Sequence, residues 1–179
     1  ADEPAQDGGA PPAARALARY AAQHAMRALI DVGAQMAGLP NQRVAELLAT
    51  ELQTARSTCR GVAFFDAAQR AWAMLDVRTG RTCPLRSSPI SERDAFCFFD
   101  ESRCRGADLK LEPTAVALLT LSLRLCKSAL MQAAGRMRGL GFGQRVRLAA
   151  RPDVDAKVRA CARVPAGEDV AVWHVLEFV

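Results

Sequence analysis

The sequence predicts an α+β fold made of two units, in each of which a long helix precedes an antiparallel meander of strands. Two long stretches carry apolar residues at helical spacing, and each is followed by short runs that alternate or are rich in Val, Phe and Leu. The turns between those runs are short, and strands joined by short turns pair antiparallel. Helices and strands thus segregate along the chain, which is typical of the α+β class.

The first unit is predicted over residues 13–111, after a flexible arm at residues 1–12 that is rich in Gly and Pro. A helix is expected over residues 13–37, and Gly38-Leu39-Pro40 ends it. A shorter helical piece is expected at residues 44–52. The long helix is predicted from an apolar stripe at Leu17, Ala21, Ala25, Ala28, Leu29, Val32 and Met36.

Strands follow in this first unit. The runs at residues 62–66 and 71–78 are joined by four residues, which favours a hairpin. The sequence Ala-Phe-Cys-Phe-Phe at residues 95–99 indicates a compact aromatic strand, and residues 107–111 are expected to form another.

The second unit is predicted over residues 112–179. Pro113 suits the first turn of a helix, which is expected to run to Met137. Alternating or apolar runs then predict strands at residues 144–150, 156–164 and 170–179.

Composition limits the function classes. Half of the 179 residues are hydrophobic and 24% are charged, as in ordinary globular proteins, and no apolar run reaches the roughly 18 residues that span a bilayer. The net charge of +5 lies wholly after residue 112. A basic surface is therefore expected there, although a nucleic-acid partner is not, because Phe142 is the one aromatic residue between residues 136 and 163 that could stack on bases. The expected surface consists of Arg136, Arg138, Arg145, Arg147 and Arg151.

Six cysteines occur, no two of them at CxxC spacing and none beside a histidine, so no metal site is predicted. An even number of cysteines without a metal pattern indicates disulfides and an oxidising compartment, although six free thiols in a cytosolic protein remain the alternative. The first residues would suit a secreted chain after removal of a signal peptide, or equally a trimmed fragment. The predicted disulfide-forming residues are Cys59, Cys83, Cys97, Cys104, Cys126 and Cys161.

Catalytic and cofactor motifs are not apparent. Gly139, Gly141 and Gly143 follow a predicted helix, whereas a dinucleotide loop follows a strand and opens a helix. His24 and His174 are expected to be a surface residue and a buried structural residue, respectively. Since nucleophilic catalysis needs a base near its nucleophile, no enzyme activity and no cofactor are predicted.

The cysteine segment resembles a known family. Cys83-Pro84, then Cys97-Phe98-Phe99, then Cys104-Arg105-Gly106 is similar to the cathelin domain of cathelicidin precursors, in the cystatin superfamily. The resemblance covers residues 13–111 and implies a Cys83–Cys97 disulfide. The second unit, from Leu111-Glu112-Pro113-Thr114 onwards, is similar in plan to the second domain of the latexin family.

The protease-blocking motifs of cystatins are absent. Gln144-Arg145-Val146-Arg147-Leu148 lacks the glycine of their Gln-x-Val-x-Gly hairpin, and Trp173 follows Val172 instead of proline. The predicted function is therefore that of a secreted, non-enzymatic binding or protease-inhibitor-like protein whose partner is a protein, with proteases among the candidates. The alternative is an intracellular or viral interaction or adaptor domain with a basic C-terminal surface.

Overall fold

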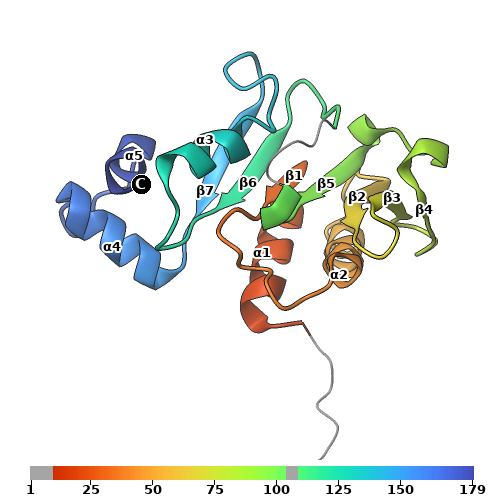
Figure 1. Cartoon of the computed structure of the whole chain (residues 1–179), viewed down its shortest axis with the longest axis horizontal. Coiled ribbons are helices and arrows are strands. Elements are labelled where there is room, and N and C mark those ends of the chain that lie inside the picture. The colour runs from red at the N-terminus through yellow and green to blue at the C-terminus, as the bar shows by residue number, and fades with distance from the viewer. Residues whose placement is uncertain (1–9, 104–108) are drawn as a thin grey trace, which may run out of the picture.

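The computed structural model describes residues 10–103 and 109–179, and its centre is a mixed sheet of seven described strands in the order β4-β3-β2-β5-β1-β6-β7 (Figure 1). Strands β2, β5, β1, β6 and β7 run parallel to one another, while β3 is antiparallel to both of its neighbours. The strands are β1 (Ala28–Ile30), β2 (Gly61–Asp66), β3 (Ala71–Asp76), β4 (Thr82–Pro84), β5 (Ala95–Phe99), β6 (Val116–Thr120) and β7 (Arg145–Ala149).

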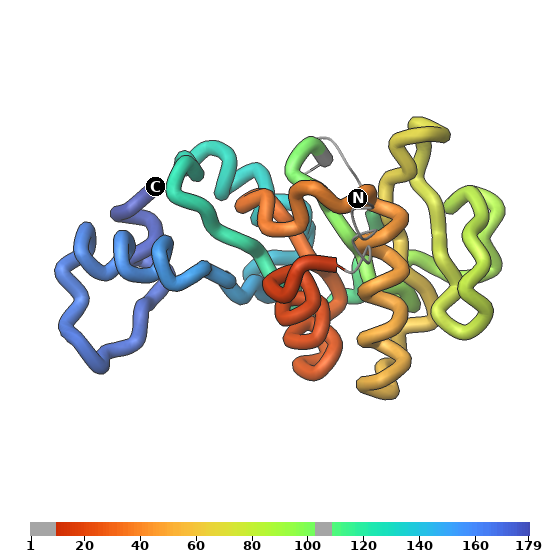
Figure 2. Tube along the Cα trace, turned by 90° about the horizontal axis from the view of Figure 1, so that it is seen from below, coloured from red at the N-terminus to blue at the C-terminus, as the bar shows by residue number. Residues whose placement is uncertain are grey.

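Helices cover both faces of the sheet. Helices α1 and α2 lie side by side on one face, and α3 lies on the other (Figures 1 and 2). Helices α4 and α5 pack mainly on each other, beyond β7 at one end of the molecule. The helices are α1 (Pro12–Gln23), α2 (Asn41–Thr54), α3 (Lys127–Ala134), α4 (Pro152–Ala162) and α5 (Val172–Phe178), with single 3-10 turns η1 (Leu85–Ser87), η2 (Glu92–Asp94) and η3 (Glu101–Arg103).

Each face of the sheet has its own apolar core. On the α1 and α2 side, Leu29, Phe96 and Leu118 point from three adjacent strands into one cluster. On the other side, Ile30 and Leu119 pack with Leu130 of α3 and with residues of α4 and α5. Successive residues of the central strands are therefore buried on opposite faces, as expected of a parallel sheet covered on both sides.

The predicted α+β fold with two helix-and-meander units is wrong; the protein has an α/β fold with a mostly parallel sheet. The error lies in two strands that were read as parts of helices. β1 falls within the helix predicted over residues 13–37, and β6 within the one predicted from Pro113 to Met137. Short runs buried on both faces have no period-2 signal, so they fit a buried helix equally well. The real break is at Ala25, whose φ of 51° ends the first helical segment.

The last two predicted strands are also wrong. Residues 156–164 belong largely to α4, where Val154 and Val158 occupy one buried stripe four residues apart, and residues 170–179 contain α5. Short alternating runs can suit either structure, and here the helical spacing of the valines decides.

Neither these helices nor any other in the described ranges is both long and apolar enough to cross a membrane.

Several local predictions are confirmed. The predicted hairpin is β2 and β3, paired antiparallel from Gly61↔Asp76 to Asp66↔Ala71. The aromatic strand is β5, residues 144–150 contain β7, and residues 44–52 lie within α2. Most of the predicted arm at residues 1–12, and part of the strand predicted at residues 107–111, lie outside the described residues. The boundary between residues 111 and 112 stays a prediction, although strands from both sides of it share the sheet.

The predicted disulfide bonding is wrong for the cysteines that the structure describes. Cys59, Cys83, Cys97, Cys126 and Cys161 are all free, while Cys104 lies outside the described residues. Cys83 and Cys97 share one row of the sheet, linked through Met74 and Ala63. They are three strand spacings apart, about 14 Å at the usual separation. That exceeds the Cα separation of roughly 4.4–6.8 Å that a disulfide needs.

The aromatic core offers a test of the fold. Phe96 on β5 is fully buried, whereas Phe142 in the α3–β7 loop is 91% exposed. We expect Phe96→Ala to lower the free energy of unfolding by about 3–5 kcal/mol, because it removes a large side chain and leaves a cavity. Phe142→Ala is the matched control and should change it by less than about 0.5 kcal/mol. Equal midpoint shifts in chemical denaturation would contradict the assigned burial.

Thiol titration tests the cysteine assignment. In unreduced, denatured protein we expect all five described cysteines to react with a thiol reagent, and in native protein only the exposed Cys126 and Cys161 to react quickly. Cys97 should stay silent until the protein unfolds, because complete burial raises the pKa of its thiol far above that of a free cysteine. A reduced sample gives the reference count. Fewer than five reactive thiols before reduction would restore the disulfide prediction.

Candidate functional site

The connections of the parallel strands diverge at the centre of the sheet. From β1 the chain passes through α2 to β2 on one side, and from β6 it passes through α3 to β7 on the other. β1 and β6 are adjacent, and their connecting helices lie on opposite faces. In open α/β sheets, such a switch point leaves a crevice outside the carboxyl ends of the strands, where ligands bind.

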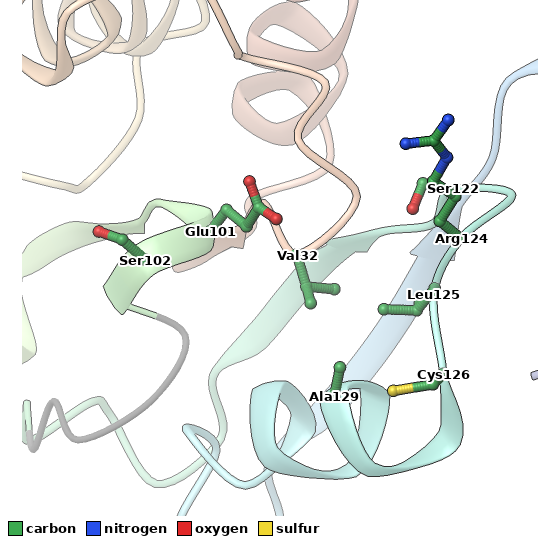
Figure 3. A pocket seen from close by; sticks show the side chains of 8 residues that line it. All are labelled: Val32, Glu101, Ser102, Ser122, Arg124, Leu125, Cys126 and Ala129. Atoms are coloured by element: carbon green, nitrogen blue, oxygen red, sulfur yellow. The ribbon is translucent and has the colours of Figure 1, made fainter.

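A cleft of about 500 Å³ lies at this switch point (Figure 3). Val32, from the segment after β1, stands between its two walls. One wall is η3, after β5, and the other is the segment that leads from β6 into α3. Three strands thus supply the cleft from their carboxyl ends. The lining residues are Val32, Glu101, Ser102, Ser122, Arg124, Leu125, Cys126 and Ala129.

Asp31, the residue directly after β1, anchors the segment that follows this strand at the carboxyl edge of the sheet. Its side chain is buried, and its two oxygens accept three hydrogen bonds. Oδ1 accepts from the Gln35 backbone N–H at 2.8 Å and from the Thr120 hydroxyl at 2.7 Å, and Oδ2 accepts from the Met36 N–H at 2.7 Å. Burial of a carboxyl group is tolerated when hydrogen bonds of this kind replace those it would make to water. The segment after β1 is thereby tied to the end of β6.

The same segment approaches β6 very closely at Gly33. The Gly33 N–H donates to the Thr120 hydroxyl oxygen at 2.9 Å, and the Gln35 side-chain amide donates to the Leu121 carbonyl at 2.9 Å. A Cβ atom at Gly33 would lie 2.7 Å from the Leu121 backbone, so only glycine fits. Val32, between Asp31 and Gly33, is therefore held at a fixed position in the cleft.

The wall after β5 is held by Asp100. Its Oδ1 accepts from the Ser102 hydroxyl at 2.7 Å, and its Oδ2 accepts from the Asn41 side-chain amide. Asn41 also donates to the Phe65 carbonyl at 2.9 Å, which links the ends of β2 and β5. These bonds orient η3, whose exposed Glu101 faces the cleft.

The opposite wall presents a thiol at the start of α3. Cys126 is the N-cap residue, is exposed, and lies 3.2 Å from the Ser128 hydroxyl (Sγ to Oγ). The pKa of Cys126 is lowered below that of a free thiol, chiefly by the Ser128 side chain and next by the Ala129 backbone N–H. The first turn of a helix carries partial positive charge and free N–H groups, which favour an anion at this point. Arg124 stands at the rim and extends away from Cys126 (Figure 3).

The residues singled out in the sequence are dispersed by the fold. Of the described cysteines, only Cys126 lines the cleft. Gly139, Gly141 and Gly143 form the α3–β7 loop, which precedes β7 and so lies at the amino end of that strand. The Tyr20 carbonyl is 2.9 Å from His24 Nδ1, and His174 Nδ1 accepts from the Ala171 N–H, so both histidines are engaged away from the cleft.

The five arginines of the predicted basic surface come from different elements of the fold. Arg136 and Arg138 follow α3, Arg145 and Arg147 lie on β7, and Arg151 pairs with Asp153 at 2.8 Å. That surface stays a prediction. Within the described part of the chain, no group of three or more His, Cys, Asp or Glu side chains is placed to hold a metal ion.

Sequence reasoning missed the cleft residues because they come from three separated segments. A signal was nevertheless present, since polar residues directly follow two apolar strands. Asp31 follows Ala28–Ile30 and Asp100 follows Ala95–Phe99. In a parallel sheet these positions meet at one edge, but in an antiparallel meander they do not.

Comparisons with protein-family models, with curated proteins and with solved structures found no match. The predicted membership of the cystatin superfamily is wrong, because a mostly parallel α/β sheet replaces the expected helix wrapped by an antiparallel sheet. The cathelin-like cysteines at positions 83 and 97 lie on β4 and β5, in the same sheet and unpaired.

The Cys126 thiol gives a direct test of the cleft's electrostatics. Because its pKa is lowered, the rate of alkylation by iodoacetamide should reach its plateau at a lower pH than for a free thiol such as N-acetylcysteine. Ser128→Ala removes the largest cause and should move the rate profile of Cys126 back to higher pH. Mass spectrometry assigns the modified residue. A profile that does not move in Ser128→Ala would contradict the role of this hydrogen bond.

Proposed function

We propose that the chain is a non-enzymatic binding domain that takes a small molecule with an anionic group in the cleft at the carboxyl ends of β1, β5 and β6. The observation that carries this proposal is the position of the cleft at the switch point of a parallel sheet. Its volume lies within the roughly 300–1,000 Å³ usual for small-molecule sites. Its lining combines apolar side chains with polar and charged ones: Val32, Leu125 and Ala129 with Glu101, Ser102, Ser122, Arg124 and Cys126.

The preference for an anion rests on the first turn of α3. The Ser128 hydroxyl lies 3.2 Å from Cys126 Sγ and, with the Ala129 N–H, lowers the pKa of this thiol, so the same groups suit a carboxylate, sulfate or phosphate oxygen. Arg124 at the rim adds a positive charge. Glu101 on the opposite wall favours a ligand that also carries a hydroxyl or an amine.

A binding role is favoured over catalysis by what surrounds the thiol. A cysteine nucleophile is usually activated by a histidine, and both histidines are engaged elsewhere in the described structure. Secretion and protease inhibition stay predictions. Their support came from the expected disulfides and the expected cystatin-like fold, and the structure has neither among its described residues.

The alternative role, an interaction domain with a basic C-terminal surface, also stays a proposal. A specific observation supports it. Arg145 and Arg147 are exposed on β7, and neither guanidinium has an ion-pair or hydrogen-bond partner within the described residues.

Sulfate, whose charge does not change near neutral pH, is the probe for the anion site. In a ¹H–¹⁵N NMR titration at constant ionic strength, sulfate should shift the amide signals of Lys127, Ser128 and Ala129, because these open α3. Cys126→Asp should abolish the shifts, since a carboxylate at the N-cap occupies the same N–H groups and repels the ion.

Cys126→Ser is the matched control and should retain sulfate binding. An aspartate N-cap stabilises a helix, so loss of binding in Cys126→Asp would not result from unfolding of α3. Equal sulfate shifts in both variants, or none in the unaltered protein, would overturn the proposed anion site.

A further inference from the structure

Strand β7 forms one edge of the sheet, and its outward backbone groups are open. The Arg145 N–H donates to the Ala115 carbonyl at 3.0 Å, and the Ala149 carbonyl accepts from the Leu121 N–H at 2.8 Å, so these two residues face β6. In a parallel ladder every second residue faces the same neighbour. The N–H and C=O groups of Val146 and Leu148 therefore point away from β6, toward the free edge.

A groove of about 470 Å³ runs along this edge. Helices α4 and α5 pack on each other beyond β7 (Figure 2). Val158 and Val175 are buried at its base, while Val172 at the start of α5 is 60% exposed beside it. The lining residues are Tyr20, Leu121, Val146, Arg147, Leu148, Ala150, Asp155, Val158, Val170, Val172 and Val175.

The two faces of β7 differ in chemistry at this edge. Val146 and Leu148 point to the face that carries the α3, α4 and α5 cluster. Arg145 and Arg147 point to the opposite face, on the same side as Ala149, which packs against the α1 and α2 cluster. A strand added beside β7 would therefore meet valine and leucine on one face and arginine on the other.

Two charged side chains line the groove, Arg147 and Asp155. Asp155, the one acidic lining residue, is neutralised by Arg159 at 2.8 Å. Arg145 and Arg147 remain without an ionic partner in the described structure, so their charges are available to a ligand. Opposite charges on neighbouring strands attract one another across the pair, whereas like charges repel.

We propose that β7 accepts an extended peptide by strand addition, and that the peptide carries acidic and apolar side chains in alternation. Its backbone pairs with the N–H and C=O groups of Val146 and Leu148. Its acidic side chains face Arg145 and Arg147, and its apolar side chains enter the groove. In this mode the main chain supplies affinity and alternate side chains supply specificity. The inference rests on the alternative, interaction-domain role above and is independent of the cleft.

The first experiment uses a fluorescein-labelled peptide, Glu-Val-Glu-Val-Glu-Val, and measures its binding by anisotropy. NMR-detected amide hydrogen exchange then locates the contact. Val146 and Leu148 amides should exchange fast in the free protein and slowly with the peptide, because they gain hydrogen bonds. The Arg147 amide, which faces β6, should be protected in both states and serves as the internal control.

Charge reversal tests the pairing. Arg145→Glu together with Arg147→Glu should weaken binding of the acidic peptide by about tenfold or more, because two attractions become two repulsions. The same variant should gain affinity for Lys-Val-Lys-Val-Lys-Val. Arg81→Glu with Arg86→Glu makes the same charge change near β4, at the opposite edge of the sheet, and should leave binding almost unchanged.

Val146→Pro tests the backbone contact. Proline removes the outward N–H, is tolerated on an edge strand, and leaves the bonds to β6 in place. It should abolish binding, whereas Val146→Ala, which keeps the N–H, should retain most of it. A peptide with alternate N-methylated amides should also fail to bind.

The outcomes distinguish failure of strand addition at β7 from failure of the interaction-domain role. Binding that depends on the arginines but tolerates Val146→Pro, without new amide protection, would overturn strand addition and leave a general basic interaction surface. If the acidic peptide does not bind at all, both strand addition at β7 and the basic interaction surface are overturned. Tighter, salt-sensitive binding of a single-stranded oligonucleotide through the same arginines would overturn the peptide as the ligand. Peptide-independent dimerisation that protects Val146 and Leu148 would assign the edge to a second copy of the chain.

Discussion

The buried carboxylate of Asp31 is the group on which the functional edge of this protein depends. A buried carboxyl group must be satisfied by hydrogen bonds, and Asp31 accepts them from two backbone N–H groups and from the Thr120 hydroxyl. Those donors belong to the segment after β1 and to the end of β6. One carboxylate therefore fixes the point at which the two central strands diverge, and with it the position of Val32 in the cleft.

The sequence predicts the local elements of this fold much better than its topology. The β2–β3 hairpin and β5 were recognisable because their apolar runs are bounded by turn residues. β1 was not, since three residues buried on both faces continue the helical spacing of α1. The error propagates, because losing β1 and β6 removes the parallel core and leaves only an apparent meander. The class of the fold thus depended on eight residues, three in β1 and five in β6.

The cleft could not have been predicted without the correct sheet. Asp31, Asp100 and Thr120 are far apart in the chain, and they meet only because β1, β5 and β6 are adjacent and parallel. Cys126 was identified in the sequence, but as a disulfide partner. Its free thiol gains its character from being the N-cap of α3, a helix that begins fourteen residues after the predicted start at Pro113. The same residue thus changes from a structural to an electrostatic role.

The two proposed surfaces are joined through Leu121. Its N–H donates to the Ala149 carbonyl at the end of β7, its carbonyl accepts from Gln35 beside Asp31, and its side chain lines the β7 groove. Contiguity of this kind does not by itself couple two sites, because coupling needs an element with two discrete arrangements. The Asp31 network has each of its partners satisfied in one arrangement, and the backbones of Gly33 and Leu121 approach so closely that a side chain at position 33 would clash. The rigid junction that shapes both surfaces therefore favours independent binding at each of them.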